Sequence, residues 1–152
     1  IAACARGGVD WLALGAPSGP VGHVHRKGGA AAPYFDGLDG PAVYPGFHVI
    51  AGLTSASGAD LLDAVMSPKG VLEALAVRVD GRTELWLANR TAEPVTADLG
   101  AAAAEGARVV MLDAEGFERL AGDPDYPGTA VRDLSGPTVA LDAYAVARIS
   151  FG

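Results

Sequence analysis

His23 and His25 are the side chains whose types and spacing most directly suggest chemistry. On an extended segment, residues i and i+2 face the same way, so both imidazoles could reach one metal ion. A third ligand would have to come from Asp36, Asp39 or His48. A zinc motif normally carries further ligands at fixed spacing, and a lone H-x-H pair lacks them. The sequence therefore favours two histidines in a polar loop, with no bound metal and no cofactor.

His48 is a second candidate, because one turn into an expected helix it could act as a general base. We favour a structural role, in which the ring bonds to a neighbouring carbonyl. Ser18 is not placed as a nucleophile, because the nucleophile elbow needs glycine two residues to either side and this serine lacks that spacing. The sequence thus predicts no catalytic residue in this chain. His23, His25 and His48 remain as candidates for contacting a substrate.

Composition narrows the classes of function. The 152 residues carry 18 acidic and 11 basic side chains, a formal net charge of −7, which argues against nucleic acid as a partner. No apolar run is long enough to span a membrane, so no membrane segment is expected. The single cysteine, Cys4, excludes an internal disulfide and a cysteine-based zinc site. A chain with one cysteine and no internal disulfide fits a reducing compartment, and we expect a cytoplasmic location.

The second half of the chain has the period of β-strands. Residues 71–79 and 83–89 are strand-like runs on either side of Asp80-Gly81, a dipeptide that favours a type I′ hairpin turn. Four more strands are expected at residues 95–99, 107–112, 139–141 and 143–151, with a helical turn at 117–120 and a loop at 123–128. Short strands separated by turn signals indicate an antiparallel β-sandwich over residues 59–152.

The first half has a different order of elements. Residues 1–8 are typical of a helix stopped by a glycine pair, and the apolar run at 9–14 is typical of a buried parallel strand. Residues 15–46 form a long loop rich in glycine and proline. A helix is expected from residue 45 to about 57. Phe47, Ile50, Ala51 and Thr54 would share one side of it.

This order is that of the last βα unit of a (β/α)8 barrel, which we assign to residues 1–58. One unit cannot close a barrel of about eight strands, so the rest would lie upstream of Ile1 or in a separate chain. The expected fold is therefore mainly β, an antiparallel sandwich preceded by a partial β/α segment.

Three segments resemble a known family. Tyr44–Leu53 is similar to the last barrel helix of glycoside-hydrolase-like proteins, particularly the D-apionate lactonase group. Leu85–Thr91 resembles the L-x-L-A-N-x-T strand of their C-terminal sandwich, and Ala143–Ile149 resembles their closing strand. Trp11–Pro20 would correspond to barrel strand 8 and its loop. This sequence departs from the family at Gly15–Ser18, where an acidic or aromatic residue often stands.

The resemblance implies that the catalytic acid and base lie at the ends of barrel strands 4 and 7, outside this chain. The whole protein would open a lactone or cleave a sugar-derived substrate. Its catalytic barrel would be the partner of this domain, which would stabilise it. The alternative is an independent carbohydrate-binding or protein-interaction module, which would need exposed aromatic side chains. The chain has ten aromatics, and Trp11 and Trp86 lie in apolar runs that favour core packing.

Overall fold

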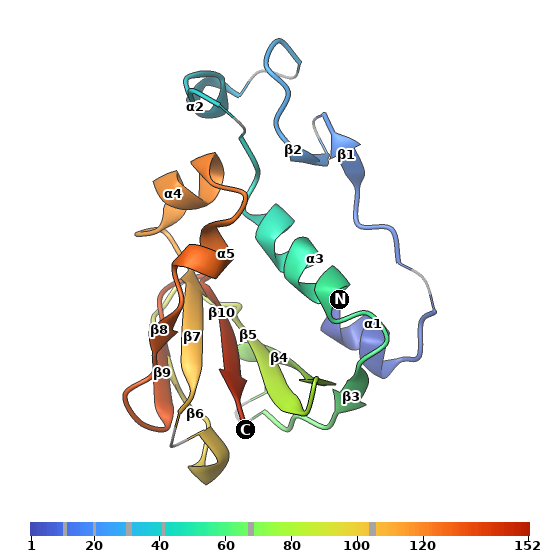
Figure 1. The fold of residues 1–152 in the computed structure, drawn as a ribbon, viewed down its shortest axis with the longest axis vertical. Coiled ribbons are helices and arrows are strands. Elements are labelled where there is room, and N and C mark those ends of the chain that lie inside the picture. The colour runs from blue at the N-terminus through green and yellow to red at the C-terminus, as the bar shows by residue number, and fades with distance from the viewer. Residues whose placement is uncertain (11, 20, 30–31, 41, 67–68, 104–105) are drawn as a thin grey trace.

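A six-stranded antiparallel sheet forms the centre of the molecule, in the order β3-β4-β5-β10-β7-β8 (Figure 1). The computed structural model describes residues 1–152 except 11, 20, 30–31, 41, 67–68 and 104–105. The strands of this sheet are β3 Asp60–Leu62, β4 Leu72–Val79, β5 Arg82–Asn89, β7 Arg108–Leu112, β8 Arg132–Asp133 and β10 Val146–Phe151. A second antiparallel pair consists of β6 Val95–Asp98 and β9 Thr138–Leu141.

The remaining elements are short. The helices are α1 Ala2–Arg6, α2 Pro33–Asp36, α3 Gly46–Ser55, α4 Phe117–Gly122 and α5 Tyr126–Thr129, with a 3₁₀ turn at Ala101–Ala103. β1 Ala16–Ser18 and β2 Gly22–Val24 form a small parallel pair. The expected mainly β fold is confirmed, with antiparallel sheets preceded by short helices. None of the helices in the described part of the chain has the length and apolar character needed to cross a membrane.

The β4–β5 hairpin forms as its sequence predicts. Asp80 has a φ of 50° and Gly81 a φ of 80°, as a type I′ turn requires at both central positions. The expected strands at 95–99, 107–112, 139–141 and 143–151 are confirmed as β6, β7, β9 and β10.

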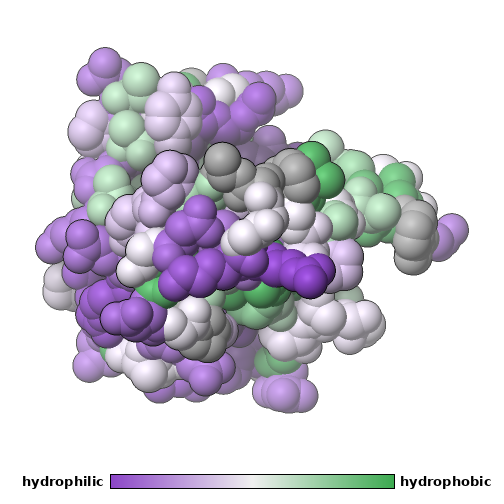
Figure 2. Space-filling model, turned by 90° about the horizontal axis from the view of Figure 1, so that it is seen from above, coloured by the Kyte–Doolittle hydropathy of each residue, from purple (hydrophilic) through white to green (hydrophobic). Residues whose placement is uncertain are grey.

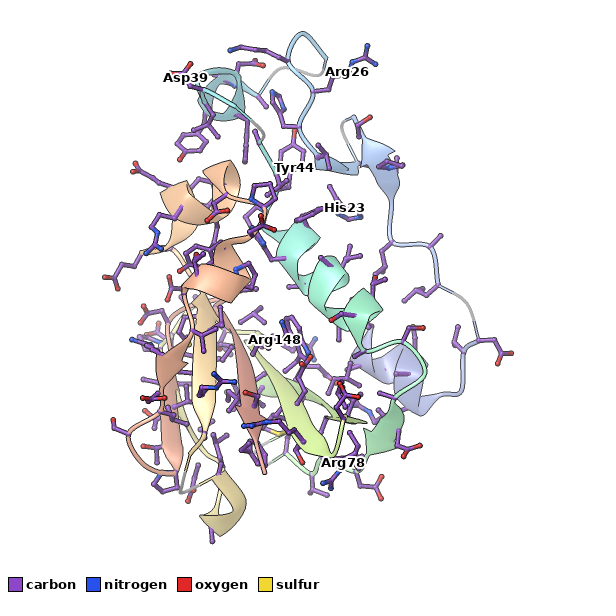
Figure 3. All side chains as sticks on the ribbon, in the orientation of Figure 1. His23, Arg26, Asp39, Tyr44, Arg78 and Arg148 are labelled. Atoms are coloured by element: carbon purple, nitrogen blue, oxygen red, sulfur yellow. The ribbon has the colours of Figure 1, made fainter. Side chains whose placement is uncertain are left out.

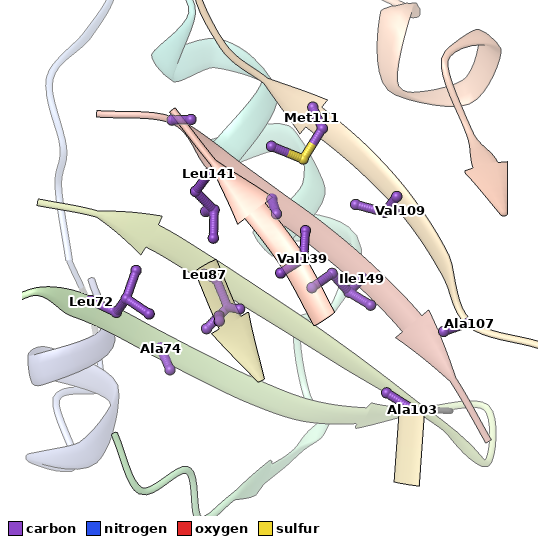
Figure 4. Packing of buried hydrophobic residues seen from close by; sticks show 13 residues of the cluster. Leu72, Ala74, Leu87, Ala103, Ala107, Val109, Met111, Val139, Leu141 and Ile149 are labelled. Atoms are coloured by element: carbon purple, nitrogen blue, oxygen red, sulfur yellow. The ribbon is translucent and has the colours of Figure 1, made fainter. Parts of the chain in front are cut away.

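The six-stranded sheet has an apolar cluster on each face. Successive side chains of a strand point to opposite faces, so one strand contributes to both clusters. On β7, Val109 and Met111 belong to one apolar cluster, and Val110 and Leu112 belong to another. The first cluster lies between the sheet and the β6–β9 pair and forms the core of the sandwich (Figure 4). The second lies on the opposite face, which the helices cover (Figure 1).

Helix α3 covers part of this second face. Val49 and Leu53 pack on the apolar cluster that includes Trp86. The side of the helix that Phe47, Ile50, Ala51 and Thr54 were expected to share is exposed at Ala51 and Thr54. Gly52 brings the helix close to the sheet, because its missing side chain lets the helix backbone approach the Trp86 ring.

Two further local expectations differ from the structure. The described residues between 9 and 14 form no strand, and Val9, Leu12 and Leu14 are exposed. An apolar run becomes a strand only where a neighbouring strand supplies hydrogen-bond partners, and none of the described strands pairs with it. The expected loop at 123–128 contains the start of α5, where Pro127 falls in the first helical turn.

Candidate functional site

The long loop before α3 is held in place by backbone hydrogen bonds to the segment that leads into the helix. The amide of His25 donates to the carbonyl of Ala42 at 2.8 Å, and the amide of Tyr44 donates to the carbonyl of His23 at 2.9 Å. The amide of Val43 in turn donates to the carbonyl of Ala121 at 2.9 Å. These bonds tie β2 to residues 42–44 and to α4. They bring His25 next to side chains far from it in sequence.

His25 joins Asp36 and Tyr44 in a chain of hydrogen bonds. Its Nε2 lies 2.9 Å from Oδ1 of Asp36, and its Nδ1 lies 3.1 Å from the hydroxyl of Tyr44. A carboxylate can only accept, so Nε2 donates to Asp36, and in the neutral imidazole Nδ1 then accepts from the Tyr44 hydroxyl. The His25 side chain is 4% exposed, whereas that of Asp36 is 39% exposed. We call these three residues the loop triad.

Aromatic rings surround the loop triad and link it to α4. The ring of Phe35 lies 4.6 Å from that of Tyr44 and 5.6 Å from that of His25. Phe117 of α4 lies 6.1 Å from Phe35 and 5.1 Å from Tyr34. Aromatic pairs at these separations stabilise their surroundings beyond simple burial. These rings therefore form a small aromatic cluster that joins the described part of the loop to α4.

The loop triad has the order of groups that can move a proton. An imidazole oriented by a carboxylate can accept the proton of a hydroxyl, here that of Tyr44. Because His25 is almost fully buried, a ligand could reach the triad only through Tyr44 or Asp36. From sequence, Asp36 is only a possible third metal ligand, and Tyr44 is only the first residue of the segment similar to a barrel helix. No local signal identifies Tyr44, because its contact with His25 spans 19 residues.

His23 and His25 have different neighbours. A Cβ on Gly15 would lie 3.2 Å from Nε2 of His23, so the His23 ring lies against that backbone. Figure 3 shows His23 and Tyr44 where the loop meets the start of α3. Within the described ranges of the chain, no three His, Cys, Asp or Glu side chains form a group that could hold a metal ion. The described positions give no support to the H-x-H metal site.

His48 lies inside the molecule, with 1% of its surface exposed. Its Nε2 donates to the carbonyl of Leu120 at 2.7 Å and so connects α3 to α4. Its Nδ1 has no hydrogen-bond partner in the described part of the protein. The ring holds two helices together, and contact with a substrate stays a prediction for this residue as for His23 and His25.

A second polar cluster, which the sequence did not reveal, lies between α3 and the sheet. Trp86 Nε1 donates to Glu84 Oε1 at 2.7 Å, and Arg148 Nη2 donates to Glu84 Oε2 at 2.6 Å. The Arg148 guanidinium also lies 5.5 Å from the Trp86 ring centre. The core position predicted for Trp86 is confirmed, since it is 6% exposed, whereas Trp11 lies outside the described residues. Each polar group in this cluster has a protein partner, which indicates a structural role.

Comparison with solved structures shows a fold shared with one endoxylanase. A family 30 endoxylanase from Clostridium papyrosolvens C71 matches with a TM-score of 0.52 at 15% identity over 72% of this chain. A family 30 subfamily 8 xylanase from Clostridium acetobutylicum matches with a TM-score of 0.48 at 14% identity, again over 72% of this chain. This chain spans 28% of the length of each xylanase. No curated protein sequence matches it.

Comparison with protein families gives a more specific relationship. Residues 69–149 match the family described as D-apionate lactonase, C-terminal immunoglobulin-like domain. The match begins just before β4 and ends within β10, so it contains the hairpin and the β6–β9 pair. Since these residues make up more than half of the chain, this chain belongs to the family of D-apionate lactonase C-terminal immunoglobulin-like domains.

Proposed function

We propose that this chain is the accessory C-terminal β-sandwich of a sugar-lactone hydrolase or glycoside-hydrolase-like enzyme. In this proposal residues 59–152 form the sandwich, and residues 1–58 supply the last βα unit of the catalytic (β/α)8 barrel. The domain stabilises the barrel and forms one wall at the mouth of its active site. The family description supports a lactone derived from a sugar acid as the substrate class. The reacting groups would belong to the barrel.

The observation that carries the proposal is a set of exposed apolar side chains along the N-terminal segment. Val9, Leu12, Leu14, Val21 and Val24 are between 39% and 72% exposed. We call these five residues the N-terminal apolar patch. Figure 2 shows hydrophobic residues gathered on the side of the molecule that carries this segment. Apolar surface gathered in this way marks a place where another protein surface packs.

The backbone of this segment supports the same proposal. The run at residues 9–14 has the composition of a buried strand, but its described residues pair with none of the described strands. A parallel strand is buried by neighbours on both sides and by helices on its faces. The adjoining strands and the helices of a barrel would supply these neighbours. The same packing would cover Leu12 and Leu14.

The outer side of α3 offers a second contact surface. Phe47 and Ile50 are half-buried, and Ala51 and Thr54 are exposed. The opposite side of the helix is occupied by the sheet, through Val49 and Leu53. A barrel helix packs with one face on its strands, and this outer face is the one left for that purpose. The loop triad lies at the N-terminal end of the same helix and would face the mouth.

The test uses the full-length enzyme with Leu14→Asp and, as a matched control, Val65→Asp. Both residues are exposed in this chain, Leu14 by 43% and Val65 by 95%, but only Leu14 belongs to the N-terminal apolar patch. If Leu14 is buried against the barrel, an unpaired carboxylate there costs several kcal/mol. We expect Leu14→Asp to lower the unfolding temperature and the rate of lactone hydrolysis, and Val65→Asp to change neither. Two variants that both behave like the wild type would overturn the proposal.

A further inference from the structure

A polar cavity of about 360 Å³ lies beside the end of β7, between α4, α5 and β8. Figure 1 shows these four elements next to one another at one end of the sheet. Its walls include the buried residues Met111 and Tyr126, which are 8% and 7% exposed. Asp113, Glu115 and Arg119 also line it, together with Arg132. The cavity thus combines apolar surface with two carboxylates and two guanidinium groups.

These charged groups have unused hydrogen-bonding capacity. In the part of the chain that the structure describes, none of the four forms an ion pair, although all line one cavity. Asp113 accepts one hydrogen bond, from the amide of Gly116 at 2.8 Å. The Arg119 guanidinium lies 5.1 Å from the ring centre of Tyr126. Their remaining donors and acceptors are available to water or to a ligand.

Tyr126 adds a hydroxyl group to the same cavity. Its ring is buried, and its hydroxyl makes no hydrogen bond to any described residue. The hydroxyl is not among the buried polar atoms that lack a partner, so it is open to the cavity. A Cβ on Gly116 would lie 2.7 Å from this oxygen, so only glycine leaves the space beside the hydroxyl open.

We infer that this cavity binds a neutral polyhydroxylated ligand, a mono- or disaccharide. Carboxylates accept hydrogen bonds from sugar hydroxyls, and guanidinium groups donate to hydroxyl and ring oxygens. The two signs of charge are present in equal number, which favours a neutral ligand over an ion. The volume falls at the lower end of the range for small-molecule sites, which is about 300–1,000 Å³.

This site belongs to the sandwich and does not depend on the catalytic role proposed above. The test is a titration of the full protein with D-xylose, D-glucose, xylobiose and cellobiose, up to about 10 mM, followed by amide NMR. We expect saturable shifts at the amide of Gly116 with at least one of these sugars. Glu115→Ala and Arg132→Ala should each weaken binding about tenfold, the effect of losing one hydrogen bond to a charged group.

Arg82→Ala is the matched control, because Arg82 is an exposed arginine on β5 that does not line the cavity. It should leave the affinity unchanged. Glu115 and Arg132 are exposed, so their removal should not unfold the protein. The inference is wrong if none of the four sugars shifts the Gly116 amide. It is equally wrong if Arg82→Ala weakens binding as much as the two cavity variants do.

Discussion

The contact between Gly52 of α3 and Trp86 of β5 determines how closely the helix sits on the sheet. A Cβ at position 52 would lie 2.5 Å from two ring carbons of Trp86, far inside the 3.4 Å at which ordinary contact begins. The indole cannot move aside freely, because Glu84 accepts its N–H at 2.7 Å and Arg148 lies over the ring. Gly52→Ala must therefore push α3 away from the sheet or break these contacts.

The size of the effect follows from two opposing contributions. Overpacking costs about 1–3 kcal/mol, whereas alanine in place of glycine in a helix gains up to about 1 kcal/mol. We expect Gly52→Ala to lower the free energy of unfolding by about 1–2 kcal/mol. That loss corresponds to a fall of about 2–8 °C in the unfolding temperature for a chain of this length. Urea titration and thermal unfolding, followed by circular dichroism, measure both quantities.

Gly46→Ala is the control within the same helix. A Cβ there would have His23 Nδ1 as its nearest neighbour, at an ordinary 3.9 Å. We expect this variant to be as stable as the wild type or slightly more stable, because it gains helix propensity without a clash. A Gly52→Ala variant that unfolds at or above the wild-type temperature would refute the close contact between the α3 backbone and the Trp86 ring.

Two further predictions concern charged groups. Glu84→Ala should lower the free energy of unfolding by about 2–3 kcal/mol, because Arg148 and the Trp86 N–H lose their acceptor. Glu84→Gln keeps an acceptor and should cost less in urea titration; equal losses would contradict this reading. A hydrogen bond from Arg6 lowers the pKa of Glu73, so this carboxylate stabilises the fold above its unfolded-state pKa of about 4.3. That contribution is lost as pH falls through the lower folded-state pKa. The free energy of unfolding of the wild type should therefore fall more than that of Glu73→Gln between about pH 5 and pH 3. Equal falls in the two proteins would contradict this prediction.

Local sequence signals were sufficient for the hairpin. β4 and β5 are eight-residue runs of strand-like composition, and the turn between them contains a dipeptide that tolerates positive φ at both positions. These signals act over neighbouring residues and need no knowledge of the rest of the fold. The same reasoning located β6, β7, β9 and β10.

Elements that depend on distant partners were not predictable in this way. β3 has three residues and β8 has two, and each forms only along an existing strand, β4 or β7. The run at residues 9–14 was predicted to be a strand, but its described residues do not form one. Its composition predicts burial, but composition does not supply the neighbouring strands that burial requires.

The candidate site was predicted only in part. His25 and Asp36 were both named from their chemistry, as possible ligands of one metal ion. Their actual relationship is a direct hydrogen bond that extends to the hydroxyl of Tyr44. This arrangement depends on the path of the chain between β2 and α3, which turns back so that Val24 pairs with Val43. A pattern of residue types does not specify such a path.

We propose that this domain acts as part of a larger sugar-lactone or glycoside hydrolase. The most direct test is the intact mass of the native gene product, measured beside its activity on sugar lactones and glycosides and compared with the 15.3 kDa chain. We predict a product much larger than 15.3 kDa that hydrolyses such a substrate, while the 152-residue chain alone does not. A native product of 15.3 kDa would contradict the claim.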